Sequence, residues 1–189
     1  ETNVNMTFHE LRKGTIKHNF IHTLNSRGNP DTLKIDPLLL YKIIVHTIPP
    51  VVKDSVKLNP GKHNIIGIDA PQGNLHLSYD ERSDFKKVVA IVRKNKEMNT
   101  LNVQEFNSTE KYIVGKYDLE VLTLPRILVK DVEISQSHTT NVKIDSPGLA
   151  TIVSNISGYG SLYLEDTNKL TWVYNLNENL QKETLLLQP

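Results

Sequence analysis

Apolar and polar residues alternate along much of the chain, which is the pattern of half-buried β-strands. Residues 119–124 and 162–164 alternate or carry the aromatic and β-branched side chains that favour strands. Gly, Pro, Asn and Asp interrupt such runs roughly every eight to twelve residues, the spacing of short strands in a β-sandwich. The pattern therefore predicts an all-β protein.

One segment fits two interpretations. Phe85, Val88, Val89 and Val92 occupy positions i, i+3, i+4 and i+7, as on one face of a helix. However, residues 88–92 are rich in β-branched side chains, which favour strands. We therefore predict a strand in this segment.

The chain contains an internal repeat. Placing Tyr41 on Tyr117, an offset of 76 residues, aligns residues 41–71 with 117–147 without a gap. Eight of these 31 positions are identical, and six more pair one aliphatic residue with another. The identical positions in the first copy are Tyr41, Val45, Thr47, Pro49, Val56, Ile68, Asp69 and Pro71. A repeat on this scale predicts a modular architecture.

The period extends to both ends of the chain. Residues 32–37 resemble residues 184–189, which lie two periods later. We predict three modules: residues 1–52 form a partial or small β-module, residues 53–129 a β-sandwich module, and residues 130–189 a β-sandwich module lacking its last strand.

Two proline-containing dipeptides mark the expected boundaries, Pro49-Pro50 and Pro125-Arg126. Proline cannot donate to a central strand ladder, so we expect strand pairing to break at both. Aliphatic residues follow each dipeptide directly, which predicts modules that abut. The expected fold is thus a semi-rigid rod of small tandem β-sandwich modules, immunoglobulin-like or prealbumin-like.

Composition narrows the classes of function. The chain has 22 basic and 21 acidic residues, so no net field favours nucleic acid or an acidic membrane as a partner. It has no cysteine, which removes disulfides, thiolate catalysis and zinc-thiolate sites. No run approaches the roughly 20 apolar residues of a transmembrane helix. The first residues have neither an initiator Met nor the features of a signal peptide, so we expect a segment of a larger protein.

The histidines do not form a metal motif. His18 and His22 are four residues apart, and a strand would separate them by about 13 Å, too far for one ion to bridge. His63 is interpreted as a strand residue beside a turn. No metal ligand or cofactor-binding residue is predicted.

Two loops resemble ligand sites only superficially. Asp80, Glu81 and Asp84 lack the dense alternating ligands of a calcium loop and are interpreted as a solvated turn. Residues 158–161, Gly-Tyr-Gly-Ser, precede a strand rather than a helix N-terminus and are interpreted as a turn. No G-x-S-x-G motif or marked carboxylate pair is present, so the chain is predicted not to be an enzyme.

The strongest candidate for a binding surface is aromatic. Tyr163, Trp172 and Tyr174 lie on two runs that are expected to pair as a hairpin, with Trp172 and Tyr174 on one face. On an exposed face these rings would form a platform for a sugar, and facing inward they would be the core of a small sandwich. The sequence leaves both interpretations open.

Several segments together resemble a known family. They are ETNVNMTF, HTLNSRGNPDTL, VHTIPPVVKDSVKLNPGKHNIIGIDAPQG, KYIVGKYDLEVLTLPRI, DVEISQSHTT and GYGSLY. They resemble the region that follows the von Willebrand factor type A (VWA) domain in secreted Bacteroidetes proteins, and the resemblance spans nearly the whole chain. It implies an upstream VWA domain followed by tandem β-modules of a prealbumin-like or carboxypeptidase-regulatory-like kind.

The resemblance also implies a location and a role. It implies an extracytoplasmic protein, periplasmic, cell-surface or secreted, whose partner is a protein or envelope component. The D-x-S-x-S metal motif of the VWA domain is absent here, so no functional residue carries over. We therefore expect a non-catalytic spacer or adhesion-type interaction segment. The alternative is a carbohydrate-binding module that uses Trp172, Tyr174 and Tyr163.

Overall fold

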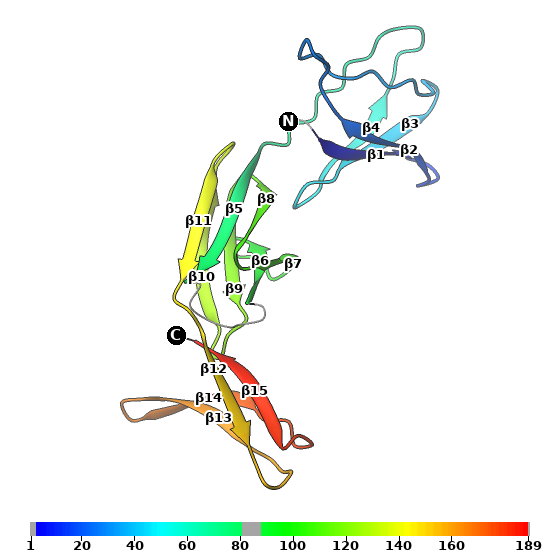
Figure 1. Ribbon diagram of the computed structural model, residues 1–189. Helices are drawn as coiled ribbons and strands as arrows, with labels where there is room; N and C mark the ends of the chain where they lie inside the picture. The colour runs from blue at the N-terminus through cyan, green and yellow to red at the C-terminus, as the bar shows by residue number, and fades with distance from the viewer. Residues whose placement is uncertain (1–2, 81–87, 189) are drawn as a thin grey trace. The chain divides into compact units, whose positions relative to one another are not determined.

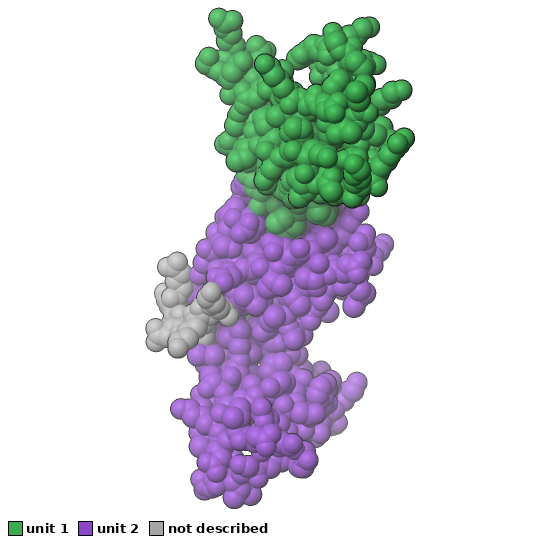
Figure 2. Space-filling view, turned by 90° about the vertical axis from the view of Figure 1, so that its right-hand side faces the viewer, with its two compact units in different colours: residues 1–73, 111–114 green, residues 74–110, 115–189 purple. Residues whose placement is uncertain are grey.

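The computed structural model describes residues 3–80 and 88–188 and contains no helix among them (Figure 1). Every regular element there is a β-strand, from β1 to β15. The all-β prediction is therefore confirmed. The chain divides into two compact units, residues 1–73 with 111–114 and residues 74–110 with 115–189 (Figure 2).

Unit 1 is built on one antiparallel sheet of four strands in the order β2-β1-β3-β4. Its core consists of alternate residues from these strands and the segment that follows β4, because successive side chains of a strand point to opposite faces. The strands are β1 (Val4–Glu10), β2 (Ile16–His22), β3 (Leu40–Val45) and β4 (Val51–Lys57). The buried core residues are Phe8, Tyr41, Ile43, Val56 and Leu58.

Unit 2 contains a second four-stranded antiparallel sheet, in the order β10-β9-β6-β7, and a three-stranded sheet in the order β11-β5-β8. The inward side chains of both sheets, such as Leu77 and Val92, are fully buried, as in a β-sandwich. The four strands are β6 (Val89–Lys94), β7 (Thr100–Glu105), β9 (Gly115–Val121) and β10 (Ile127–Ile134). The three are β5 (Gln72–Tyr79), β8 (Ser108–Ile113) and β11 (Thr139–Ile144).

The last part of unit 2 consists of two small sheets. β12 (Gly148–Val153) pairs with β15 (Lys182–Leu187), and β13 (Ser161–Asp166) pairs with β14 (Lys169–Asn175). Leu185 is the only apolar residue of these four strands that is buried. This part of the chain therefore has a much smaller core than the two sheets that precede it.

The repeat reappears as two equivalent hairpins, β3–β4 and β9–β10. In each, the threonine two residues before the proline donates its Oγ1 hydroxyl to that proline's carbonyl, at 2.7 Å: Thr47 to Pro49 and Thr123 to Pro125. The Ile48-Pro49 and Leu124-Pro125 peptide bonds are both cis. Tyr41 and Tyr117 are both buried. In each copy, the identical residues therefore form the proline turn and contribute buried side chains to the core.

The expected break in strand pairing at these prolines is wrong. β3 pairs with β4 across one proline turn and β9 pairs with β10 across the other. The prolines lie in the turn, where the ladder needs no N–H donor, so the pairing continues on both sides. The predicted module boundaries, after residues 52 and 129, fall inside β4 and β10. The division into three modules stays a prediction.

The two hairpins carry opposite charges at one pair of equivalent positions. Lys42 Nζ of β3 lies 3.9 Å from Asp54 Oδ1 of β4. In the second hairpin, 76 residues later, the pair is Asp118 and Lys130, and the lysine charge contributes to lowering the pKa of the carboxyl group. Both hairpins thus have an attraction between their two strands, but the basic and acidic residues have exchanged strands.

Asp118 also holds two strained backbone positions. Its carboxylate accepts hydrogen bonds from the backbone N–H groups of Lys96 and Asp131, each at 3.0 Å. Both donors have positive φ, 63° at Lys96 and 57° at Asp131, a conformation that L-residues rarely adopt. These backbone hydrogen bonds are the main cause of the lowered pKa of Asp118. One side chain therefore fixes the β6–β7 turn and the bulge in β10.

We predict that Asp118 makes the stability of unit 2 depend on pH. Its pKa is lowered from 3.8 in the folded chain, so the folded state binds this proton less readily than the unfolded state. Its stabilisation is therefore fully present above the unfolded pKa, near 3.8, and is lost as the pH falls through the lower folded pKa. Urea unfolding at a series of pH values should show this loss, and Asp118→Asn should reduce it and lower the midpoint at neutral pH.

The matched control is Glu133→Gln, which changes an exposed carboxylate on β10. This variant should keep both the neutral midpoint and the acid-dependent loss. An Asp118→Asn protein with the native pH profile would contradict the assignment.

Candidate functional site

The predicted aromatic hairpin is present, and it places two of its three aromatic residues directly opposite each other. Tyr163 of β13 lies directly opposite Trp172 of β14. Their side chains are 51% and 56% exposed, so neither belongs to a core. Of the two interpretations that the sequence left open, the exposed surface is the one that this pair adopts.

Tyr174 lies apart from that pair, and the expected common face of Trp172 and Tyr174 is wrong. The register shifts between Leu162 and Tyr163, so that Tyr174 pairs with Leu162 while Trp172 pairs with Tyr163. Leu162 and Tyr163 are successive residues of one strand and point to opposite faces. The bulge that this shift creates in β14 was not visible in the alternating pattern.

Asn175 fixes the edge of the Trp172 ring. The indole Nε1–H donates to Asn175 Oδ1 at 2.7 Å, and the Ser161 hydroxyl donates to the same oxygen at 2.9 Å. A ring anchored by its polar edge loses less conformational freedom when a ligand stacks on its face. No motif in the sequence marks Asn175 as part of this surface.

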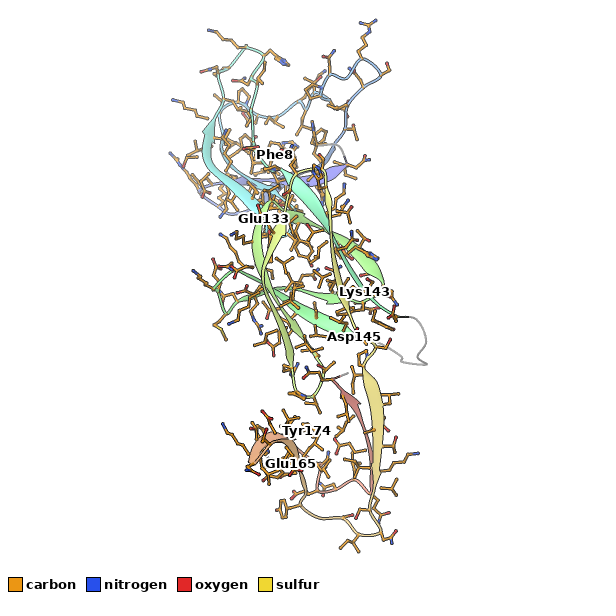
Figure 3. The ribbon with its side chains drawn as sticks, turned by 90° about the vertical axis from the view of Figure 1, so that its left-hand side faces the viewer. Phe8, Glu133, Lys143, Asp145, Glu165 and Tyr174 are labelled. Carbon is orange, nitrogen blue, oxygen red and sulfur yellow. The ribbon has the colours of Figure 1, made fainter. Side chains whose placement is uncertain are left out.

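Tyr174 has a structural partner. Its hydroxyl donates to Glu183 Oε1 at 2.7 Å, and the backbone N–H of Asn177 donates to Glu183 Oε2 at 2.9 Å. The Asn177 bond, followed by the Tyr174 bond, lowers the pKa of Glu183. The hydrogen bond to Glu183 raises the pKa of Tyr174. Figure 3 labels Tyr174 and Glu165 on the β13–β14 hairpin. These contacts tie β14 to β15, so Tyr174 joins the two small sheets.

The part of unit 2 formed by β5–β11, called the middle sandwich below, indicates which face of this hairpin is the outer one. The β6–β7 and β13–β14 hairpins close in the same way, by hydrogen bonds of 2.9 Å from Phe106 N to Val88 O and from Leu176 N to Gly160 O. Counting from these bonds, Tyr163 occupies the position of Ile91. Trp172, which pairs with Tyr163, therefore corresponds to Val103, which pairs with Ile91. Val103 is 52% exposed. The two rings therefore lie on the solvent side of their sheet.

A small hollow lies beside the hairpin. It has a volume of about 170 Å³ and is lined by residues between Ile152 and Glu183, among them Tyr159, Leu176 and Leu180. Pockets for drug-sized ligands usually measure about 300–1,000 Å³. Residues 158–160 form part of its wall and Ser161 begins β13. The interpretation of residues 158–161 as a turn is therefore wrong, because the segment before the strand is irregular. The hollow is too small and open to enclose more than a fragment of a ligand.

The histidines take separate roles. His18 lies on β2 beside the Phe8 and Tyr41 rings, with centroids 6.4 Å and 6.5 Å away. His63 is exposed and lies in an irregular segment, so its interpretation as a strand residue is wrong. Among residues 3–80 and 88–188, no three His, Cys, Asp or Glu side chains gather as metal ligands would.

The acidic loop is described only in part. Glu81, Asp84 and Phe85 lie outside the described residues. Asp80 Oδ1 lies 2.7 Å from Lys143 Nζ of β11, so this carboxylate is ion-paired. The strand predicted for residues 88–92 is present as β6, which begins at Val89.

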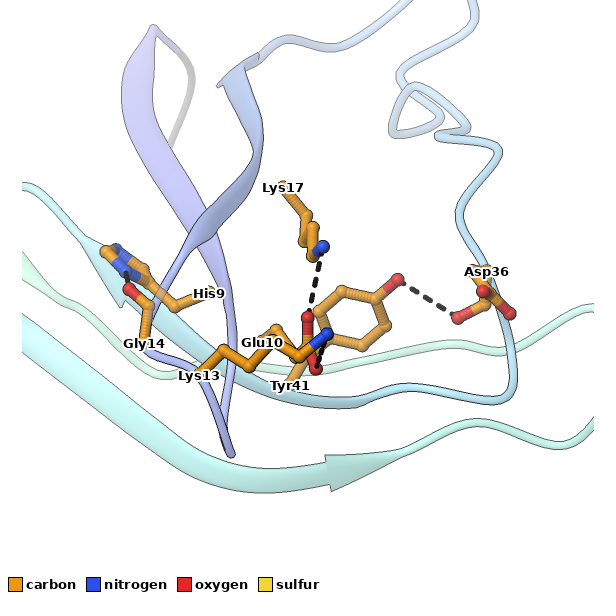
Figure 4. Close-up of polar contacts among 7 residues, drawn as sticks. All are labelled: His9, Glu10, Lys13, Gly14, Lys17, Asp36 and Tyr41. Atoms are coloured by element: carbon orange, nitrogen blue, oxygen red, sulfur yellow. Dashed lines mark hydrogen bonds and ion pairs between the residues drawn. The ribbon is translucent and has the colours of Figure 1, made fainter.

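Unit 1 contains a polar cluster that sequence reasoning missed. Glu10, at the end of β1, is only 6% exposed and lies 3.0 Å from Lys17 Nζ, with Lys13 Nζ at 3.8 Å (Figure 4). It lies opposite Tyr41, whose hydroxyl donates to the Asp36 carbonyl at 3.0 Å. Burial, followed by the charge of Asp36, raises the pKa of Tyr41. The two lysines compensate the buried charge, so this cluster stabilises the end of the sheet.

Comparison with family models, curated proteins and solved structures gives no match for this chain. The resemblance to VWA-associated modules therefore stays a prediction. In the part of the chain that the structure describes, no helix is long and apolar enough to span a membrane.

We predict that Tyr174→Phe raises the pKa of Glu183 toward its ordinary value of 4.5, because it removes one of the two hydrogen bonds that lower it. The measurement is an NMR titration of the Glu183 side-chain carboxyl. Tyr163→Phe, on the opposite face of the hairpin, should leave that titration unchanged. An unaltered Glu183 pKa in Tyr174→Phe would mean that Tyr174 does not anchor β15.

Proposed function

We propose that the chain is a non-catalytic spacer and protein-interaction segment. The observation that carries this proposal is which residues the two copies of the repeat share. Residues common to both copies, such as Thr47 with Thr123 and Tyr41 with Tyr117, make a turn and a core, whereas most of the exposed side chains differ between copies. A chain that repeats its fold without repeating a binding site suits a spacer, whose length and exposed surfaces determine its role.

A second recurring contact supports a coupled series of modules. The residue before each cis proline accepts a backbone hydrogen bond from the end of a later strand: Ile48 O from Ile113 N at 2.8 Å, and Leu124 O from Gln188 N at 2.9 Å. Leu124 N also donates to Leu186 O at 2.9 Å. Within unit 2, the contact between the Leu124 turn and the end of β15 would limit the freedom of the last four strands relative to the β9–β10 hairpin. This supports a semi-rigid series of immunoglobulin-like or prealbumin-like modules.

The proposed setting comes from the sequence resemblance. We place the chain outside the cytoplasm, after a VWA domain, where a rigid series of modules would hold that domain away from the envelope. Its partner would be a protein or envelope component. Protease treatment of cells with a permeabilised outer membrane and an intact inner membrane tests this setting, since only a cytoplasmic protein would then be protected.

We predict that Gln188→Pro uncouples the last four strands from the β9–β10 hairpin. The substitution removes the N–H that donates to Leu124, whereas Gln188→Ala keeps it. Backbone ¹⁵N relaxation should give one rotational correlation time for β9 and β15 in the native chain and in Gln188→Ala, and two different times in Gln188→Pro. Two times in the native chain would contradict the semi-rigid spacer.

A carbohydrate-binding function is the second candidate, and the exposed Tyr163–Trp172 pair favours it. Two aromatic rings on neighbouring strands, one of them anchored by Asn175, offer an apolar surface beside polar groups. Sugar rings bind to such surfaces through their apolar C–H faces. The spacer and carbohydrate functions can be separated because only the second depends on these rings.

A glycan array separates the two functions. The spacer function predicts that the array retains no glycan, because a spacer does not depend on a sugar-binding site. The carbohydrate function predicts a retained glycan whose affinity falls at least about tenfold in Trp172→Ala, the equivalent of roughly 1.4 kcal/mol. The matched control is Tyr159→Ala, which removes a 94% exposed aromatic ring outside the β13–β14 hairpin. If Tyr159→Ala keeps the native affinity for the glycan and Trp172→Ala loses it, the carbohydrate-binding function is supported instead of the spacer function.

A further inference from the structure

Two histidines of unit 1 bind one hydroxyl group on the face of the sheet that points away from the core. Thr7 and His9 of β1 lie on this face, because Phe8 between them belongs to the core. His46 Nε2 lies 2.9 Å from Thr7 Oγ1, and His9 Nε2 lies 3.1 Å from the same oxygen. The two ring nitrogens therefore converge on one point.

The contacts of His9 fix which of its ring nitrogens carries the proton. Its Nδ1 lies 3.3 Å from the Gly14 carbonyl oxygen, which can only accept a hydrogen bond (Figure 4). In the neutral ring Nδ1 is therefore protonated, and the Nε2 lone pair accepts a hydrogen bond from the Thr7 hydroxyl. Most metal-binding histidines have their second ring nitrogen held in this way by a carbonyl or carboxylate oxygen.

His46 supplies the second nitrogen. Because the Thr7 hydroxyl donates to His9, its oxygen accepts from His46, and Nε2 carries the proton of the neutral His46 ring. This ring is exposed, and within residues 3–80 and 88–188 its side chain has Thr7 as its sole hydrogen-bond partner. Transfer of the proton to Nδ1 would leave a second Nε2 lone pair facing the same point.

The common fold does not require this cluster. β1 and β6 are equivalent inner strands, because the repeated tyrosine lies opposite the last residue of each. In the middle sandwich, the positions of His9, Thr7 and His46 hold Arg93, Ile91 and Leu122, and the same strands pair there. A polar cluster that the fold does not need is typical of a functional site.

The nearest charge does not oppose a bound cation. Lys42 lies opposite His9, but its Nζ lies 3.9 Å from Asp54 Oδ1. Asp54 belongs to β4, and β3 lies between β4 and β1. The ammonium group is therefore drawn away from His9, and the carboxylate compensates its charge.

We infer that His9 and His46 bind a divalent transition-metal ion through their Nε2 atoms. Zn²⁺ and Cu²⁺ accept imidazole ligands, whereas Mg²⁺ and Ca²⁺ prefer oxygen. The two nitrogens lie at most about 6 Å apart, since both hydrogen bonds end at Thr7 Oγ1. Around a tetrahedral ion, with Zn–N distances of about 2.0–2.1 Å, they would be about 3.4 Å apart. The exposed His46 ring moves to close this distance, and water completes the coordination.

Copper binding to the full chain, without a polyhistidine tag, tests the site. Cu²⁺ is the probe because ligand sets of this kind bind it most tightly among the first-row divalent ions. The tightest site should show hyperfine coupling to two imidazole nitrogens by electron paramagnetic resonance. Zn²⁺ should displace the copper, and Mg²⁺ should not. Coupling to one imidazole nitrogen, or displacement by Mg²⁺, would overturn the inference.

Single substitutions identify the ligands. His9→Gln and His46→Gln should each weaken Cu²⁺ binding at least about tenfold, because each leaves one imidazole at the site. His76→Gln is the matched control and should keep the native affinity. His76 Nδ1 lies 2.9 Å from Thr109 Oγ1, and among the described residues no second histidine bonds to that hydroxyl. Native affinity in either site variant, or an equal loss in all three variants, would overturn the inference.

A variant copied from the middle sandwich keeps the test decisive if the glutamine variants do not fold. His46→Leu introduces the residue that the middle sandwich has at this position, Leu122. Zn²⁺ in excess should raise the urea midpoint of the native chain, followed by the amide signals of β1 and β3, because the ion binds the folded state. The midpoint of His46→Leu should not change. An equal rise in both chains would overturn the inference and leave the spacer function standing.

Discussion

The antiparallel contact between an inner strand and the tyrosine-bearing strand beside it is the interaction on which both large sheets depend. β3 and β9 each cover an inner strand, contribute fully or almost fully buried residues to a core, and lead into the cis-proline turn that returns the chain as the next strand. Among residues 3–80 and 88–188, β13 and β14 pair only with each other and bury little. In the two large sheets, by contrast, β3 and β9 each contribute core residues beside an inner strand.

This dependence separates the residues that build the fold from the exposed residues that are candidates for binding. Tyr117, Leu119, Val121 and Thr123 are almost fully buried and recur, in identical or aliphatic form, 76 residues earlier. The Tyr163–Trp172 pair has Ile91 and Val103 as its equivalents, so it is specific to one module. A spacer needs the first set everywhere and tolerates variation in the second. Individual modules can therefore acquire binding surfaces without loss of the common fold.

The sequence predicted the strands and the repeat because both leave periodic signals. Alternation marks β9, β-branched side chains mark β6, and the 76-residue offset marks the two hairpins. Strand pairing across Pro49 and Pro125 was missed, because proline excludes a position from a ladder but does not say whether that position lies between paired strands. The separation of Trp172 from Tyr174 depends on a bulge, and the anchoring by Asn175 and Glu183 depends on contacts between residues with no common motif. Such features arise only from the folded geometry.

The reversed charge pair has a consequence for how a repetitive chain folds. Tandem copies with similar strands can exchange partners and become trapped in misfolded states. If β3 were to pair with β10, Lys42 would face Lys130, and if β9 were to pair with β4, Asp118 would face Asp54. Only the native combinations, Lys42 with Asp54 and Asp118 with Lys130, bring opposite charges together. The charge pattern of the two hairpins therefore favours strand pairing within each copy over strand exchange between copies during synthesis.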